Sequence, residues 1–80
     1  MGITEDLADE LAKEAIKAVE LTGNEDLFDE ISRMLGSTSQ TAEEAFLTAV
    51  RVRRANARAR QLLAEKVRAH KAAKDGGGPS

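Results

Sequence analysis

The strongest constraint on the fold is an uninterrupted stretch in the second half of the chain. Between Thr41 and Gly76 the sequence holds neither proline nor glycine, the two residues that most readily break a helix. Thr41 is followed three residues later by Glu44, which is the spacing of a capping box at a helix start. We therefore expect one long helix over about residues 42–74, which would be roughly 50 Å long at 1.5 Å per residue.

A shorter helix is predicted near the N-terminus. Thr4 stands where an N-cap would lie, and Gly23 suits a left-handed C-cap, so this helix should cover about residues 5–22. Apolar residues recur in it at three- and four-residue steps, as in an amphipathic helix. The expected apolar stripe consists of Leu7, Leu11, Ala15, Ala18 and Val19.

A second short helix should follow over about residues 25–35. Asn24 can cap its start, and Gly36 stands where its apolar periodicity stops. Its expected apolar residues are Leu27, Phe28, Ile31, Met34 and Leu35. Met34 and the two phenylalanines, Phe28 and Phe46, have the spacing of core residues.

The long helix changes character along its length. Phe46, Leu47 and Val50 point in three directions around its axis, so its first turns should be wedged between the two short helices. Beyond Arg51 only a narrow, alanine-rich apolar stripe remains. We predict an all-α fold in which two short amphipathic helices pack on the start of a long C-terminal helix, giving a three-helix head with a projecting basic arm. Residues 1–75 should form this single domain, and the glycine-rich residues 76–80 a disordered tail.

Charge is sorted along the chain. Residues 1–45 carry a net charge of −9 and residues 46–80 a net charge of +7, although the whole chain is only −2. Such a gradient is typical of proteins that contact nucleic acid, membranes or acidic proteins. A chain of 80 residues also gains only about 3–5 kcal/mol from a single core, which favours further burial by self-association or by a partner.

Arginines dominate the start of the basic segment. Arg51, Arg54 and Arg58 share one face of the predicted helix, whereas Arg53 and Arg60 line another edge of the apolar stripe. One interpretation is a solvated helix surface. The other is a surface for an acidic partner, since guanidinium groups bind carboxylates through two hydrogen bonds and tolerate interfaces better than ammonium groups. The predicted partner-binding residues are Arg51, Arg53, Arg54, Arg58, Arg60, Leu62 and Leu63. Packing within the chain should not need the face shared by Arg51, Arg54 and Arg58.

Asn56 lies in the apolar stripe, seven residues from both Ala49 and Leu63. A buried asparagine at such a heptad position could fix the register of an oligomer. The alternative is that Asn56 lies at the solvent edge of a loose helix face. The acidic first two helices could neutralise the basic helix within one chain or across a homodimer. Parallel pairing of two long helices would set like charges side by side, whereas an antiparallel or exchanged arrangement avoids much of that repulsion.

Motifs for chemistry are missing from the sequence. The chain has no cysteine, which excludes thiolate metal sites and thiol nucleophiles, and its single histidine, His70, has no carboxylate at ligand spacing. Asp26, Asp29 and Glu30 share a helix face but lack the bent loop of a calcium site. The hydroxyl residues Ser37, Thr38, Ser39 and Thr41 have no positioned base. We expect no enzymatic activity, catalytic residue, metal or cofactor.

These observations predict a non-enzymatic protein-interaction module of the adaptor, docking, chaperone or assembly type. Its basic helix would bind an acidic protein surface or self-associate. The alternative is a nucleic-acid-binding protein that lays this helix on the phosphate backbone, but Glu43 and Glu44 stand where a helix-turn-helix would read bases. Neither a membrane nor a small-molecule substrate is expected as a partner. The acidic N-terminus has no continuous apolar run, so we expect a cytoplasmic protein without a signal peptide.

Overall fold

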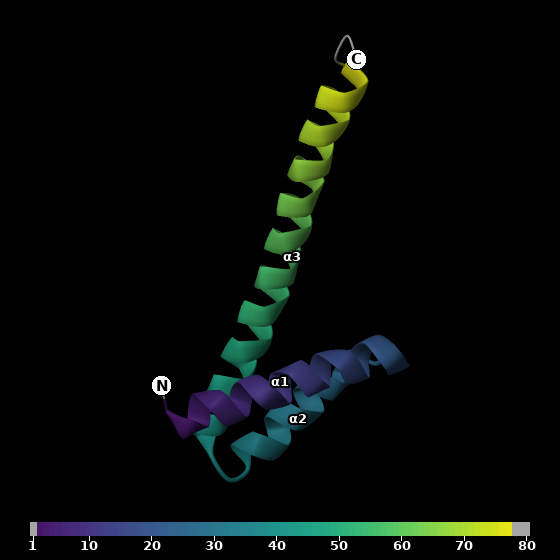
Figure 1. Cartoon of the computed structure of the whole chain (residues 1–80). Coiled ribbons are helices and arrows are strands. Elements are labelled where there is room, and N and C mark those ends of the chain that lie inside the picture. The colour runs from purple at the N-terminus through teal and green to yellow at the C-terminus, as the bar shows by residue number, and fades with distance from the viewer. Residues whose placement is uncertain (1, 78–80) are drawn as a thin grey trace.

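The computed structural model describes residues 2–77, with side chains described for residues 2–73. This part of the chain forms three helices: α1 (Ile3–Thr22), α2 (Asp26–Gly36) and α3 (Gln40–Gly77). α2 runs back opposite to α1, and both lie across the first turns of α3, while the rest of α3 extends away from them (Figure 1). The predicted all-α fold, with two helices packed on the start of a long C-terminal helix, is confirmed.

The helix ends agree with prediction at some sites and differ at others. Gly23 has a φ of 72°, and its N–H donates to the carbonyl oxygen of Val19 at 2.7 Å, so the predicted left-handed cap is confirmed. The predicted Thr4 cap is wrong, because α1 begins at Ile3 and Gly2 occupies the N-cap position without a side-chain hydrogen bond. Oδ1 of Asn24 accepts from the N–H of Asp26 at 3.1 Å, at the start of α2.

The capping box predicted for α3 is also wrong. Ser39 supplies the cap instead, because its Oγ accepts from the N–H of Ala42 at 3.0 Å and the helix begins at Gln40. At the other end α3 continues through Gly76 and Gly77, which were predicted to belong to the tail. The rest of the predicted tail, residues 78–80, lies outside the described residues.

The core lies where α1 crosses α3. Phe46 is fully buried, and it packs with Val50 of α3 against small residues of α1. Alanine side chains let the two helix backbones approach closely. The buried apolar residues are Ala8, Ala12, Ala15, Phe46 and Val50. The predicted wedging of the first turns of α3 therefore matches the structure, with a core that is small even for this chain length.

Two predicted apolar positions are exposed. Leu7 is 63% exposed because the buried face of α1 is the one that carries Ala8 and Ala12. Met34 is 75% exposed because α2 packs through a different face, formed by Phe28, Ile31 and Leu35. Phe28 itself is half-buried at the edge of the core.

A partly buried hydrogen bond joins α2 to α3. Ser32 lies on the packed face of α2, and its Oγ donates to Oε2 of Glu43 at 3.0 Å. Glu43 thus holds the two helices together across the short connection between them. The same carboxylate lies so close to Gly36 that an added Cβ there would stand 2.6 Å from Oε1 of Glu43.

Candidate interaction surface

Beyond the core, α3 forms a projecting arm, which we define as residues 54–73. Every side chain of the arm is exposed, whereas the preceding turns of α3 include buried and half-buried residues (Figure 1). An isolated helix gains little stability from its own hydrogen bonds, so helical structure is normally supported by packing of an apolar face. Within the described residues, the arm has no such packing.

The arm carries an uncovered apolar face. Val52, at its base, is 60% exposed, and Leu63 and Val67 are 65% and 46% exposed. Together with Asn56 and Ala59 these residues follow one another at three- and four-residue steps, so they lie on one side of the helix. We call this set, Val52, Asn56, Ala59, Leu63 and Val67, the α3 stripe. Leu62 is exposed too, but it lies at the flank of the stripe.

Arg53 is engaged within the chain. Its Nε and Nη2 donate to Oδ1 and Oδ2 of Asp9 at 2.6 and 2.8 Å, a bidentate ion pair between α3 and α1. The hydrogen bond from Arg53 is the main reason that the pKa of Asp9 is lowered from 3.8. The same bond raises the pKa of Arg53. This predicted partner-binding residue therefore has a structural contact of its own.

Arg54 also contacts the head. Its guanidinium carbon lies 5.4 Å from the centroid of the Phe28 ring, at cation–π distance, and its Nη2 lies 3.8 Å from Oε1 of Glu25. The expectation that packing would not use the face of Arg51, Arg54 and Arg58 is thus wrong for Arg54. The reason is that α2 crosses α3 on this side.

The other predicted arginines face solvent. Arg51 and Arg58 form no ion pair with any described carboxylate, and Arg60 donates through Nε to Oδ1 of Asn56 at 3.1 Å. Asn56 is exposed, so within one chain it lies at a solvent edge and orients the guanidinium of Arg60 beside the α3 stripe. Leu62 and Leu63 are exposed on the same arm.

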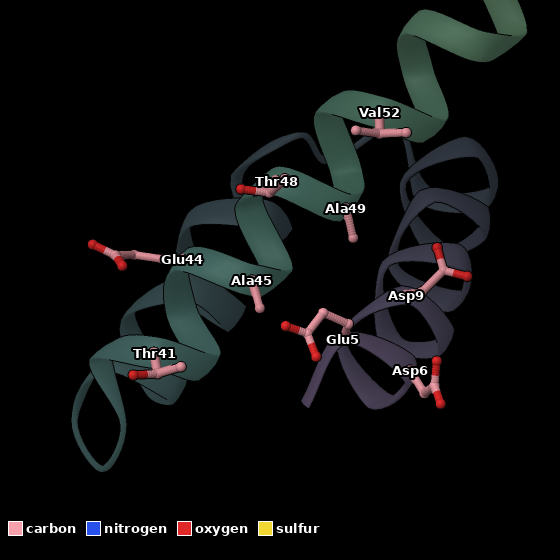
Figure 2. A pocket seen from close by; sticks show the side chains of 9 residues that line it. All are labelled: Glu5, Asp6, Asp9, Thr41, Glu44, Ala45, Thr48, Ala49 and Val52. Carbon is pink, nitrogen blue, oxygen red and sulfur yellow. The ribbon is translucent and has the colours of Figure 1, made fainter. Parts of the chain in front are cut away.

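A groove that the sequence did not reveal lies between α1 and the first half of α3. Figure 2 shows Ala45, Ala49 and Val52 on its α3 side, with Glu5, Asp6 and Asp9 on α1. Glu44 adds a fourth carboxylate, and the groove has a volume of about 600 Å³. We call it the acidic groove. Its members are far apart in sequence, and only the crossing of α1 over α3 brings them together.

Arm and groove carry opposite charges. The arm holds six basic side chains and one acidic one, so its net charge is +5. These are Arg54, Arg58, Arg60, Lys66, Arg68 and Lys71, with Glu65 as the acid. Four acidic residues line the groove, but the carboxylate of Glu44 points away from α1 (Figure 2), and that of Asp9 is already paired with Arg53. The two surfaces are thus electrostatically complementary.

The described residues offer few other sites. No helix among them is long and apolar enough to cross a membrane. In the same part of the chain, no three histidine or acidic side chains converge in a way that could hold a metal ion. Comparison with protein-family models, curated proteins and solved structures gives no match for this chain.

Proposed function

We propose that this protein is a non-enzymatic protein-interaction module, in which the three-helix head anchors the arm and the arm binds an acidic protein surface. The observation that carries the proposal is the uncovered α3 stripe with basic groups beside it. Leu63 and Val67 stand exposed in the stripe, and the guanidinium of Arg60 is held at its edge by Asn56.

This combination suits a protein partner. Protein interfaces place an apolar centre inside a polar rim, and arginine is enriched in them relative to lysine. Residues 51–60 contain five arginines and no lysine. Because guanidinium groups bind carboxylates through two hydrogen bonds, Arg51, Arg58 and Arg60 favour a partner that presents aspartate or glutamate.

Nucleic acid is the competing partner. The arm has no aromatic side chain on which a base could stack. Glu43 lies in the first turn of α3 and Glu44 directly follows it, so phosphate would be repelled at this end of the helix. Arg58, Arg60 and Arg68 also lie on different sides of the arm. A helix that binds in a groove of nucleic acid concentrates its basic side chains on one side. These features favour the protein partner.

A photo-crosslinking experiment tests the proposal. A photoreactive amino acid is placed at Leu63 in the full chain, or at Leu21 as a control, because Leu21 is at least as exposed but lies on α1. In the native cell, protein adducts are expected from position 63 only, and Arg58→Glu with Arg60→Glu should reduce them. Equal adducts from both positions, or adducts to nucleic acid alone, would contradict the proposal.

A further inference from the structure

We infer that the acidic surface bound by the arm belongs to a second copy of this chain, so that two α3 helices pair antiparallel and each arm lies in the acidic groove of the other copy. The inference rests on the proposed function, because it takes the arm as the binding element. It adds the identity of the partner and the register of the contact.

The acidic groove and the α3 stripe form one continuous surface. Ala45 and Ala49 of the groove precede Val52 by seven and three residues, so they share its side of α3. Val52 belongs both to the groove and to the α3 stripe. The apolar side of α3 therefore runs without a break from inside the groove along the arm. An antiparallel partner helix that follows this side would pass from the stripe into the groove.

The side chains of the α3 stripe also fit against one another in an antiparallel register. In a two-fold symmetric antiparallel pair, a step forward along one helix is a step backward along the other. Setting Leu63 of one copy against Val52 of the other also brings Val67 close to Ala49 and Ala59 against Asn56. Leu63 thus packs against the exposed Val52, and Val67 packs against the small Ala49. The same contacts occur twice, once on each side of the axis.

The charges along α3 also favour antiparallel over parallel pairing. The bond between Arg53 and Asp9 marks the edge of α3 along which α1 lies. Arg60 and Lys71 follow on this same edge, and in an antiparallel pair that edge of one helix faces the same edge of the other. With Leu63 set against Val52, Lys71 would lie opposite Glu44 and beside Glu5 and Asp6 of the second copy, which line the groove. Arg60 would lie opposite Ala55, near the ion pair of Arg53 with Asp9. A parallel pair would instead set the arms, each +5, side by side.

The large exposed area of the chain also favours pairing. The chain exposes 6343 Å². A compact protein of 8.6 kDa would expose roughly 4,700 Å². The excess is about twice the roughly 800 Å² that each partner contributes to a standard interface. Since only five apolar residues are buried among those that the structure describes, pairing would give this protein the larger core that its length does not provide.

Disulfide trapping tests the register, because the chain has no cysteine of its own. Val52→Cys and Leu63→Cys are made separately in the full chain. When the two variants are mixed and oxidised, the mixed disulfide should form, since positions 52 and 63 face each other. Each variant alone should form almost none, because its own counterpart would lie 11 residues away, about 16 Å, whereas a disulfide needs Cα atoms within about 7 Å.

A parallel pair would give the reverse result, with self-disulfides from each variant and no mixed species. All three species in statistical proportion would indicate collision between monomers. Either result would overturn the inference. Leu21→Cys, exposed on α1, is the control that should form no disulfide-linked dimer under the same conditions.

Sedimentation equilibrium of the cysteine-free chain measures the pairing itself. Leu63→Glu should raise the dissociation constant at least about tenfold, because a carboxylate would replace an apolar contact. Reversing Glu5 to Lys, or Lys71 to Glu, should weaken pairing, and combining the two reversals should restore it. Lys17→Glu on exposed α1 is the matched control and should have no effect. Failure of the combined variant to recover would contradict the charge match.

A monomer at all concentrations would overturn the second copy as the partner. The photo-crosslinking result then separates the two proposals. If Leu63 still captures a different protein, the proposed function stands and only the identity of the partner is wrong. If Leu63 captures no protein at all, both proposals fail.

Discussion

Arg53 binds Asp9 through two parallel hydrogen bonds, one from Nε to Oδ1 at 2.6 Å and one from Nη2 to Oδ2 at 2.8 Å. The bond joins two residues 44 positions apart and ties α1 to α3. Directly after Arg53, every described side chain of α3 is exposed. This ion pair therefore lies next to the boundary between the head and the arm, and Arg54, directly after it, still contacts Phe28 of the head.

Asp9 should titrate at a lower pH than an unperturbed aspartate. Its pKa is lowered from 3.8, chiefly by the hydrogen bond from Arg53 and further by the charges of Arg53 and Lys13, while partial burial acts in the opposite direction. Because the folded pKa lies below the unfolded value, the bond stabilises the fold above pH 3.8, and this contribution is lost as the pH falls through the lowered pKa. A carboxyl NMR titration should give a midpoint below 3.8, and Arg53→Gln should raise it. Identical midpoints in the two proteins would contradict this assignment.

Phe46 should dominate the stability of the head. It is the one fully buried large side chain among the described residues, so Phe46→Ala is expected to lower the free energy of unfolding by about 3–5 kcal/mol. Leu62→Ala, on the exposed arm, should change it by less than about 0.5 kcal/mol when measured on dilute monomer. Denaturant unfolding followed by circular dichroism compares the two. A small loss for Phe46→Ala would mean that the core lies elsewhere.

The sequence predicted the helices well because their periodicity and stop signals are local. The burial of Phe46 followed from its position among apolar neighbours, and the cap at Gly23 from the need for a positive φ. Pairing between distant residues could not be predicted in the same way. The partner of Arg53, the buried Ser32 and the acidic groove all depend on the angle at which α1 and α2 cross α3, which no local pattern specifies.

The exposed Met34 shows a related limit. Its spacing fits an apolar stripe on α2 as well as that of Phe28 and Ile31, and only the packed helices decide which side of α2 is covered. On α3, by contrast, the sequence predicted a narrow apolar stripe, and the structure leaves its residues Leu63 and Val67 uncovered.

The bond between Ser32 and Glu43 should contribute measurably to the junction of α2 and α3. Ser32→Ala leaves a partly buried carboxylate with one donor fewer, so a loss of about 0.5–1.5 kcal/mol is expected. A double-mutant cycle with Glu43→Ala should show a coupling energy of similar size. Additive effects of the two substitutions would show that the hydrogen bond does not stabilise the fold.

Arg54 and Arg58 should differ in their effects on stability although they share a face of α3. Arg54→Ala removes a cation–π contact with Phe28 and should cost about 0.5–1 kcal/mol. Arg58→Ala, with no ion pair to a described carboxylate, should stay within about 0.5 kcal/mol of the wild type. Thermal unfolding of the two variants at low concentration makes the comparison. Equal losses would indicate that the contact with Phe28 contributes nothing.

The arm lacks a packing partner among the described residues of one chain, and we propose that it gains one from a second copy. Hydrogen exchange of the backbone amides of residues 59–73, measured at several protein concentrations, tests this claim most directly. In dilute protein these amides should exchange quickly, as expected of a helix without tertiary packing. At high concentration they should become protected, and Leu63→Glu should abolish that protection while the amides around Phe46 remain protected throughout. Protection of the arm that is equal at all concentrations and unaffected by Leu63→Glu would contradict the account.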